Sequence, residues 1–259
     1  MPATWSNRLR FSTPAFVLRR VRWSESSLIL TLYSMDFGRV AAMARGALRP
    51  GNKFLGRLEL FSHSDVSLSR REGRELDTMT EASVISHNSG LRKDFRSFSG
   101  AALFTDWLLG VVSHSNEPSG PVYHLTGSVY NLLEEGASPW PVVCGGAAQL
   151  LLLAGHGYSA DACVSCGCSP GENPRWSHTV GGVLCENCPG TGIRVKSGIL
   201  SFLALALRSN LENLTRVRLW PGGYIQCHSL LKEYAQVHLE QRLRLKSEKV
   251  MKEMAHAGH

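Results

Sequence analysis

The sequence has no long hydrophobic run, no phosphate-binding loop and few acidic residues near its start. Its longest apolar stretches, 147–154 and 199–207, each contain a polar residue and are far shorter than the ~20 residues of a membrane helix. No Gly-Lys dipeptide occurs, which excludes the GxxxxGK[ST] loop of P-loop ATPases. No apolar run of signal-peptide length follows Met1. We therefore expect a cytoplasmic protein whose seven cysteines are thiols or metal ligands.

Charge is distributed unevenly along the chain. Residues 1–57 contain ten basic and two acidic side chains, a net charge of +8, and residues 58–190 contain seven and fourteen, a net charge of −7. Residues 191–259 contain eleven and five, a net charge of +6, and the whole chain sums to +7. With 43% hydrophobic residues the chain can bury a core, so intrinsic disorder is excluded. The basic ends favour a polyanion as partner.

The first third of the chain alternates apolar and polar residues, as half-buried strands do. The alternation runs from Phe16 to about Ser86, and Gly, Asn and Asp residues interrupt it. Strands are expected near 17–21, 28–34, 40–44, 58–61, 66–68 and 76–85. About five short strands in about seventy residues are typical of a small β-barrel, either an OB-fold or an SH3-like barrel.

After Ile85 the apolar spacing changes to three or four residues, which predicts helices. They are expected over 95–111, 122–133, 143–154 and 199–207, and from Tyr224 towards Met254. The fold class is therefore α+β, with a small N-terminal β-barrel followed by an α-helical domain that carries a four-cysteine insertion. The expected parts are a basic barrel domain (1–86), a helical domain (87–160), a zinc-binding insertion (161–190) and a C-terminal helical segment packing on the helical domain (191–259).

Two CxxC pairs interrupt the helical part. Cys163 and Cys166 form the first pair, Cys185 and Cys188 form the second, and eighteen residues separate the pairs. This spacing is typical of a zinc ribbon, in which two turns aim four thiolates at one Zn²⁺ with Zn–S distances of about 2.3 Å. Four protein ligands leave no open position, so we expect one structural zinc ion per chain.

Several alternatives stay open at this cluster. The four cysteines could be buried or redox-active thiols, Cys168 could replace Cys166 as a ligand, and His178 is a weaker alternative. The segment 167–171 matches the GxSxG motif of hydrolases, but Pro170 and the CxxC turn stand where that motif needs a helix and a strand. No HExxH motif and no nucleophile–base pair is evident, so we expect no enzymatic activity.

Arginine dominates the basic N-terminal part. Nine of the ten cations in residues 1–57 are Arg, which suits bidentate contacts to phosphate. Eight aromatic residues lie among them before residue 62, and interleaved cations and rings suit single-stranded nucleic acid, although most of these rings are expected in the barrel core. The segment 46–53 is the expected basic loop. The candidate DNA-binding residues are Arg19, Arg20, Arg39, Arg45, Arg49, Lys53 and Arg57.

The C-terminal segment 239–254 also carries a basic face. It is either a second nucleic-acid contact or the solvated side of a helix, and the sequence favours neither.

The order of these parts resembles the bacterial DNA repair and recombination mediator family RecO. The best local match is the strand–turn–strand segment 28–49, where 38–40 (GRV) and 44–47 (ARGA) correspond to the family's G-[RK]-V and [AV]-[KR]-G-[AG] patterns. Residues 25–27, 238–239 and 245–247 fit as well. One departure is Leu48, which replaces a common Arg of the pattern, with Arg49 one place later.

The resemblance implies properties that composition does not show. Proteins of this family have an N-terminal OB-fold, bind single- and double-stranded DNA and anneal complementary strands without ATP. They associate with RecR and with the acidic C-terminal tail of single-stranded DNA-binding protein, and they help to load recombinase onto the coated DNA. Carried over by position, Arg39 and Arg45 are the best DNA contacts, followed by Arg49 and Lys53.

Two other functions stay under consideration. One is a zinc-ribbon accessory factor that binds RNA or a polymerase. The other is a zinc-dependent enzyme, which would need an open coordination position that four cysteine ligands do not offer.

Overall fold

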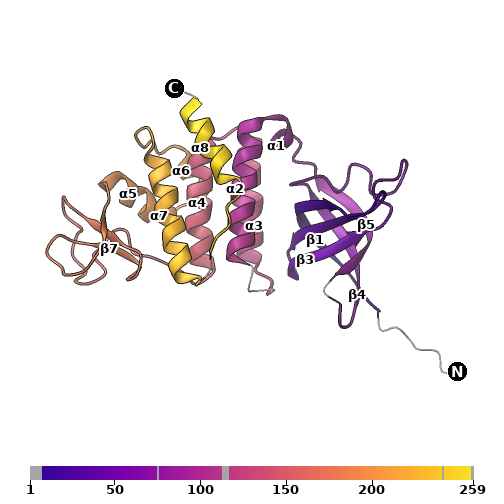
Figure 1. Ribbon diagram of the computed structural model, residues 1–259, viewed down its shortest axis with the longest axis horizontal. Coiled ribbons are helices and arrows are strands. Elements are labelled where there is room, and N and C mark those ends of the chain that lie inside the picture. Colours follow the sequence, from indigo (N-terminus) through magenta and orange to yellow (C-terminus); the bar gives the residue numbers. More distant parts are fainter. Residues whose placement is uncertain (1–7, 75, 113–116, 241, 258–259) are drawn as a thin grey trace. The chain divides into compact units, whose positions relative to one another are not determined.

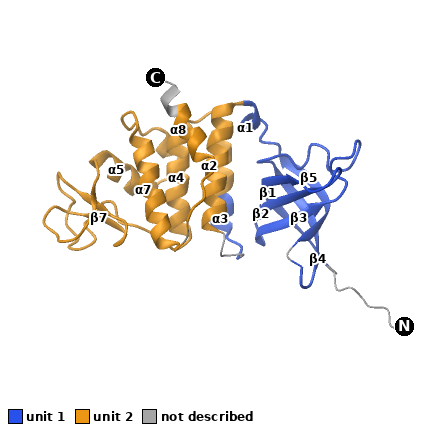
Figure 2. Ribbon diagram, in the orientation of Figure 1, with its two compact units in different colours: residues 1–93, 114–124 blue, residues 94–113, 125–259 orange. Residues whose placement is uncertain are grey.

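The structure, a computed structural model, describes residues 8–257 except 75, 113–116 and 241 (Figure 1). The chain divides into two compact units, residues 1–93 with 114–124 and residues 94–113 with 125–259 (Figure 2). The first unit contains a β-barrel, and the second contains most of the helices and a small sheet. These units are coarser than the four parts expected from the sequence, and that finer division stays a prediction.

Five strands close the barrel: β1 (Arg8–Arg22), β2 (Leu28–Ser34), β3 (Gly38–Ala44), β4 (His63–Arg71) and β5 (Asp77–Ser86). Their order is β1-β2-β3-β5-β4, and β4 pairs back onto β1. Neighbouring strands are antiparallel except for a short parallel pairing of β3 with β5. A closed five-stranded barrel confirms the predicted fold class and has the architecture of an OB-fold.

The barrel core follows the period-two alternation of the sequence. On β2 every second residue from Leu28 to Leu32 is buried, and on β3 every second residue from Val40 to Ala44 is buried. The side chains between them therefore point away from the core. This leaves partly exposed positions on the outer face of these strands, where a ligand can reach them.

The predicted strand at 58–61 is wrong. These residues lie in turns between β3 and β4, where Leu58 and Phe61 are buried and Leu58 belongs to the barrel core. Phe61 has a φ of 65°, a left-handed conformation that strands do not contain. The apolar side chains fill the barrel from a loop, and alternation alone cannot distinguish this from pairing.

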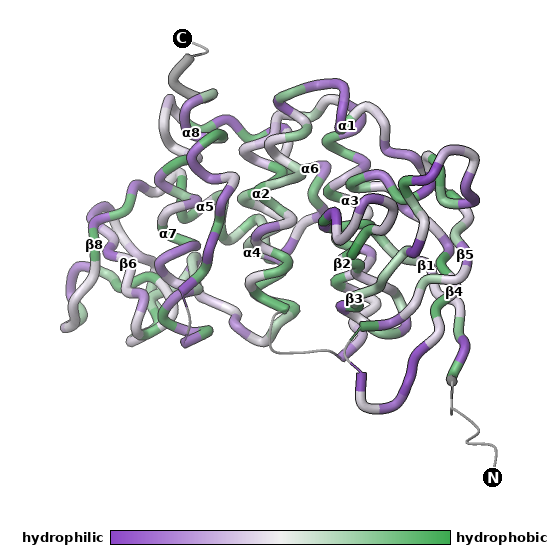
Figure 3. Tube along the Cα trace, turned by 45° about the vertical axis from the view of Figure 1, so that its right-hand side comes forward, coloured by the Kyte–Doolittle hydropathy of each residue, from purple (hydrophilic) through white to green (hydrophobic). Residues whose placement is uncertain are grey.

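The described chain contains eight helices, and in the second unit one of them packs against four others. They are α1 (Gly90–Lys93), α2 (Phe95–Val111), α3 (Gly120–Glu134), α4 (Pro139–Leu153), α5 (Ser197–Ala206), α6 (Leu211–Thr215), α7 (Gly223–His238) and α8 (Glu248–Ala257). In the second unit α4 contacts α2, α5, α6 and α7. Figure 3 shows the hydrophobic residues that run along α4. None of the helices in the described part of the chain is both long and apolar enough to cross a bilayer.

Two adjacent glycines allow close packing on α4. A Cβ atom at Gly145 would lie 2.4 Å from Cδ1 of Leu214, and one at Gly146 would lie 2.9 Å from Cε2 of Phe104. Both distances are shorter than real contacts allow, so the neighbouring helices approach α4 only because these positions lack side chains. The CGGA sequence of α4 thus determines how closely α6 and α2 pack on it.

A buried histidine joins three helices of the second unit. The indole N–H of Trp107 on α2 donates to Nε2 of His228 on α7 at 3.0 Å. Nδ1 of His228 lies 3.7 Å from a carboxylate oxygen of Glu248 on α8. Burial lowers the pKa of His228 to about 4, so the ring is neutral at pH 7.

The helix expected from Tyr224 towards Met254 is interrupted. α7 ends at His238, residues 239–240 and 242–247 are not helical, and α8 begins at Glu248. Within the break Leu243 and Leu245 are buried, and Glu240 has a φ of 51°. Because the two leucines pack inward, the segment leaves the helical path that the apolar spacing predicted.

The insertion between α4 and α5 contains a three-stranded sheet in the order β7-β6-β8. Its strands are β6 (Arg175–Ser177), β7 (Gly182–Leu184) and β8 (Ile193–Arg194). The side chain of Trp176 on β6 is fully buried and packs edge-on against Tyr158 and Tyr234. We call residues 158–194 the cysteine module, since all five clustered cysteines lie within it.

Candidate nucleic-acid interface and metal centre

The outer face of β1, β2 and β3 presents two rows of side chains in register. Val21, Ile29 and Met43 form one row, and Arg19, Thr31 and Ala41 form the other. These six residues are exposed or half-buried. Because strands 2 and 3 of OB-folds present the usual binding face for oligonucleotides, we name this surface the barrel face.

Trp23 lies just beyond one end of the barrel face, with 65% of its surface exposed. The backbone N–H of Trp23 donates to the carbonyl of Ser27 at 3.0 Å, and the backbone N–H of Leu48 donates to the carbonyl of Ser26 at 2.9 Å. The first bond closes the β1–β2 turn, and the second joins this turn to the loop after β3, which carries Arg45 and Arg49. An exposed indole and two exposed guanidinium groups therefore share one end of the barrel.

Arg39 lies near the other end of β3. Arg45 is six positions further along the chain, so the two residues are about 20 Å apart along it. A cavity of about 610 Å³ adjoins Arg39 and is also lined by Arg70, Arg74 and Asp77. Arg70 donates to both carboxylate oxygens of Asp77 at 2.8 to 3.2 Å, so this pair is internally neutralised. Arg39 and Arg74 remain as exposed cations at this end.

The seven predicted DNA-binding residues do not form one cluster. Within the described residues the side chains of Arg39, Arg45 and Arg49 have no hydrogen bond or ion pair, so they are available to phosphate groups. The other four have different surroundings: Arg19 is exposed at the edge of the barrel face, Arg20 pairs with Glu59, Lys53 lies over the ring of Phe54 and Arg57 donates to the carbonyl of Ala82.

The aromatic residues of the N-terminal part are mostly core. Of the eight noted in the sequence, Phe16, Tyr33, Phe54 and Phe61 are buried, and Trp5 lies outside the described residues. Phe11 and Phe37 are half-buried, pack on each other with a centroid distance of 4.2 Å and lie beneath Arg70. Trp23 is thus the exposed ring among those described.

Sequence reasoning did not single out Trp23 from the other aromatic residues. The sequence feature that could have identified Trp23 as exposed is its position directly after Arg22, at the end of a strand and before the turn at residues 24–26. The guanidinium group of Arg22 donates to the carbonyls of Ser24 and Glu25. Arg22 therefore stabilises the turn and is not offered to a ligand.

The structure brings the four predicted metal ligands together. The Sγ atoms of Cys163, Cys166, Cys185 and Cys188 all lie within 4.8 Å of one another. Sγ of Cys166 is 3.7 Å from Sγ of Cys185, and a tetrahedral centre with Zn–S bonds of about 2.3 Å has S···S distances of about 3.8 Å. The donor set and its spacing therefore fit a tetrahedral thiolate site.

The backbone around the sulfurs is held in tight turns. The N–H of Gly167 donates to the carbonyl of Cys163 at 2.8 Å, and Gly167 has a φ of 74° that favours glycine. Arg175 on β6 donates to the carbonyls of Cys185 and Gly190, at 3.1 and 2.6 Å, and so fixes the second turn. Hydrogen bonds from the N–H of Cys185 and from the first turn lower the pKa of Cys163 to about 6, which favours the thiolate form that binds metal.

The alternative ligands stand apart from this group. The cluster formed by the described residues does not include Cys168 or His178. The His178 imidazole lies 3.1 Å from the carboxylate of Glu233 on α7 instead. Residues 161–174, which contain the GxSxG match, form neither a strand nor a helix.

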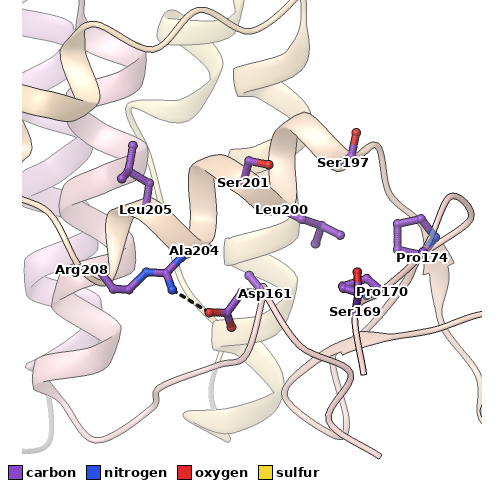
Figure 4. Close-up of a pocket in the computed structure, with 12 residues that line it drawn as sticks. Asp161, Ser169, Pro170, Pro174, Ser197, Leu200, Ser201, Ala204, Leu205 and Arg208 are labelled. Atoms are coloured by element: carbon purple, nitrogen blue, oxygen red, sulfur yellow. Dashed lines mark hydrogen bonds and ion pairs between the residues drawn. The ribbon is translucent and has the colours of Figure 1, made fainter. Parts of the chain in front are cut away.

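A pocket of about 540 Å³ lies between α5 and the loops of the cysteine module (Figure 4). Leu200 and Ala204 of α5 and Pro170 of the module provide apolar lining. At its rim Arg208 pairs with Asp161 at 2.8 Å, and both side chains are more than half exposed. The pocket thus combines an apolar lining with one accessible cation.

Comparison with known proteins covers nearly the whole chain. The family model "Recombination protein O N terminal" matches residues 9–88, and "Recombination protein O C terminal" matches residues 92–248. The first match spans the barrel, and the second spans the helices and the cysteine module.

Curated relatives agree with these matches. The DNA repair protein RecO of Symbiobacterium thermophilum is 27% identical over 242 residues, 91% of this chain and 95% of the relative. The proteins of the same name from Frankia casuarinae and Streptomyces griseus subsp. griseus are each 30% identical, over 88% and 90% of this chain and 93% and 96% of their own lengths. The family resemblance inferred from the sequence is confirmed, and the chain belongs to the recombination protein O family.

Proposed function

We propose that this protein is a DNA-binding recombination mediator that anneals complementary strands without ATP. Membership of the recombination protein O family supports a role in DNA repair and recombination. We add three finer points to this role. The protein anneals strands, it helps to load recombinase onto DNA coated with single-stranded DNA-binding protein, and it acts on the chromosome in the cytoplasm.

The observation that carries this proposal is the arrangement on the barrel face. Trp23, Arg45 and Arg49 lie at one end and Arg39 lies about 20 Å away along β3. Between them the face is mostly uncharged and half-buried. Cations that follow a phosphate backbone and an exposed ring that stacks on a base are the usual elements of single-strand binding.

The length of the barrel face fits a short stretch of one strand. Stacked nucleotides rise about 3.4 Å each, so about 20 Å corresponds to roughly six nucleotides. OB-folds bind roughly 4–16 nucleotides. A strand held in this way keeps its bases accessible for pairing, and a second strand on the same protein then pairs at a raised effective concentration with less mutual repulsion.

We propose that Zn²⁺ occupies the four-cysteine centre. Leu184 is the one apolar side chain, besides the cysteines themselves, in the buried cluster at these sulfurs, so little apolar packing among the described residues holds the two turns together there. A bound Zn²⁺ would hold the two turns together and contribute roughly 10–16 kcal/mol of apparent binding energy to folding. Its role would be structural, because the four thiolates complete the tetrahedron.

The proposed protein partners are RecR and the acidic C-terminal tail of single-stranded DNA-binding protein. The pocket in Figure 4 is the best candidate for the tail, since Arg208 suits a carboxylate and the apolar lining beside it suits a non-polar side chain of a peptide. Asp161 competes for Arg208. We therefore expect Arg208→Gln to weaken, and Asp161→Asn to strengthen, the binding of a synthetic acidic tail peptide in a fluorescence titration. RecR is proposed from the family alone, and co-purification tests it.

Mixing complementary oligonucleotides with and without the protein, in the absence of ATP, tests the proposed function. We expect faster annealing, and we expect Arg39→Ala with Arg45→Ala to reduce it. Arg10→Ala with Arg71→Ala, on the β1–β4 side of the barrel, removes the same charge and serves as the control. Tighter binding to structured RNA than to single-stranded DNA would favour the accessory-factor alternative instead.

A further inference from the structure

The break between α7 and α8 carries a row of cations. From Arg242 to Lys246 burial alternates strictly: Arg242, Arg244 and Lys246 are exposed, while Leu243 and Leu245 are 4% and 8% exposed. We call residues 242–246 the basic ridge. In an extended chain every second residue lies roughly 6–7 Å further along, so the ridge presents positive charge at regular intervals on one side.

The ridge is fixed to the helices beneath it. Leu243 packs against α2 where Gly110 has no side chain, since a Cβ atom there would lie 2.6 Å from Cδ2 of Leu243. At the end of the ridge the N–H of Ser247 donates to the carboxylate of Asp106 at 2.8 Å. The leucines and this bond hold the backbone, so the three cations do not lose further backbone entropy on binding.

The cations of the ridge lack partners. Among the residues that the structure describes, none makes a hydrogen bond or ion pair with the side chains of Arg242, Arg244 or Lys246. The nearest acidic residue along the chain on the α8 side, Glu248, is already held by Lys232 and by Lys252, the latter at 2.7 Å. A cavity of about 610 Å³ lies beside the ridge and is lined by residues 242–246, Lys232 and Gln236.

We infer that the basic ridge is a second nucleic-acid site, which binds the phosphate backbone of one strand. Regularly spaced, unpaired cations match the repeating charge of a polynucleotide, and two of the three are Arg, which can contact phosphate in a bidentate manner. This inference deepens the proposed annealing function and rests on it, because it identifies where the second strand is held.

An acidic peptide fits the ridge less well. Peptide recognition usually needs an apolar pocket for an anchoring side chain. Leu243 and Leu245 do line the cavity beside the ridge, but only 4% and 8% of their surfaces are exposed, so they offer little apolar area to a peptide side chain. The ridge therefore offers charge without an apolar anchor.

Binding of a fluorescent single-stranded oligonucleotide to the full chain at several salt concentrations tests the inference. The affinity falls as salt rises, and removing three phosphate contacts should make the slope of log K against log salt less steep by about 2. Between 50 and 200 mM salt the variant should therefore lose about 20-fold less affinity than the wild type. We expect this change for Arg242→Gln with Arg244→Gln and Lys246→Gln. The matched control, Arg194→Gln with Arg216→Gln and Lys249→Gln, removes the same charge from exposed positions of the same unit and should leave the slope unchanged.

Other results separate the inference from the proposed function. A triple variant that folds as the wild type and retains its salt slope overturns the ridge as a DNA site, even if the wild type anneals DNA. Loss of deca-glutamate binding with unchanged DNA binding would also overturn it and assign the ridge to an acidic protein. Protection of Lys246 from acetylation by bound oligonucleotide would support it directly. If the triple variant shows the expected change of salt slope but the wild type does not accelerate annealing, the proposed function is contradicted while the ridge remains a DNA site.

Discussion

Replacing Trp23 by Ala tests how the barrel face binds a single strand. With 65% of its surface exposed, Trp23 presents roughly 160 Å² of a residue whose full area is at most about 250 Å². Covering one side of the ring with a base buries about half of this, or about 80 Å². At about 25 cal/mol per Å² this amounts to about 2 kcal/mol, or about 30-fold in affinity.

This magnitude agrees with the roughly 1–3 kcal/mol per stacked base found for aromatic residues in single-strand sites. The substitution should leave folding intact, because backbone hydrogen bonds and not the indole hold the turn of Trp23. Fluorescence anisotropy with a short oligothymidylate measures the affinity, and thermal unfolding measures stability.

Two further variants make the test specific. Trp23→Phe should keep most of the affinity, since a benzene ring also stacks on bases. Leu55→Ala, at another exposed apolar residue of the barrel unit (68% exposed), should change nothing. If Trp23→Ala bound DNA as tightly as the wild type, the stacking role would be refuted and the barrel face would act through charge alone.

Three other predictions concern the second unit. The purified protein should contain one zinc ion per chain, and Cys185→Ser should remove it while Cys168→Ser retains it, as elemental analysis would show. The pKa of His228 is lowered from 6.5 to about 4 by burial, so the unfolded chain binds the proton first as the pH falls. Stability should be full above pH 6.5 and fall by up to about 3 kcal/mol towards pH 4, and in urea unfolding His228→Gln should flatten this dependence. Gly145→Ala should cost about 1–3 kcal/mol because its Cβ meets Leu214 at 2.4 Å, whereas Gly120→Ala, with open space around it, should cost little.

Each of these predictions has a contradicting outcome. Zinc retained in Cys185→Ser would place the metal elsewhere, and a pH dependence unchanged in His228→Gln would assign the acid instability to other groups. Equal stabilities of the two glycine variants would show that α4 and its neighbours adjust without cost.

The sequence predicted the features that depend on local pattern. Alternation from Phe16 to Ser86 identified the barrel because each strand buries one face, and the CxxC spacing identified the sulfurs because each turn is short. The chain from Leu58 to Phe61 shows the limit of such patterns. Its apolar residues fill the barrel from a loop, and only the closure of the sheet distinguishes this from a sixth strand.

Local sequence pattern also does not predict which residues lie on the binding surfaces. Trp23 is exposed and Phe54 is buried although each directly follows a basic residue, and the difference arises from tertiary packing. The apolar spacing predicts a helix through 242–246, with a basic face that is either a second nucleic-acid contact or solvated. The segment forms the basic ridge instead because Leu243 fits against Gly110, a contact between residues far apart in the sequence.

The rate of annealing of complementary oligonucleotides without ATP tests the central claim most directly. The account predicts that the wild-type protein accelerates pairing, measured by fluorescence energy transfer between end labels. It predicts that Arg39→Ala with Arg45→Ala loses most of this acceleration and that Arg10→Ala with Arg71→Ala keeps it. A wild-type rate equal to that of the oligonucleotides alone, at protein concentrations that saturate DNA binding, would contradict the account.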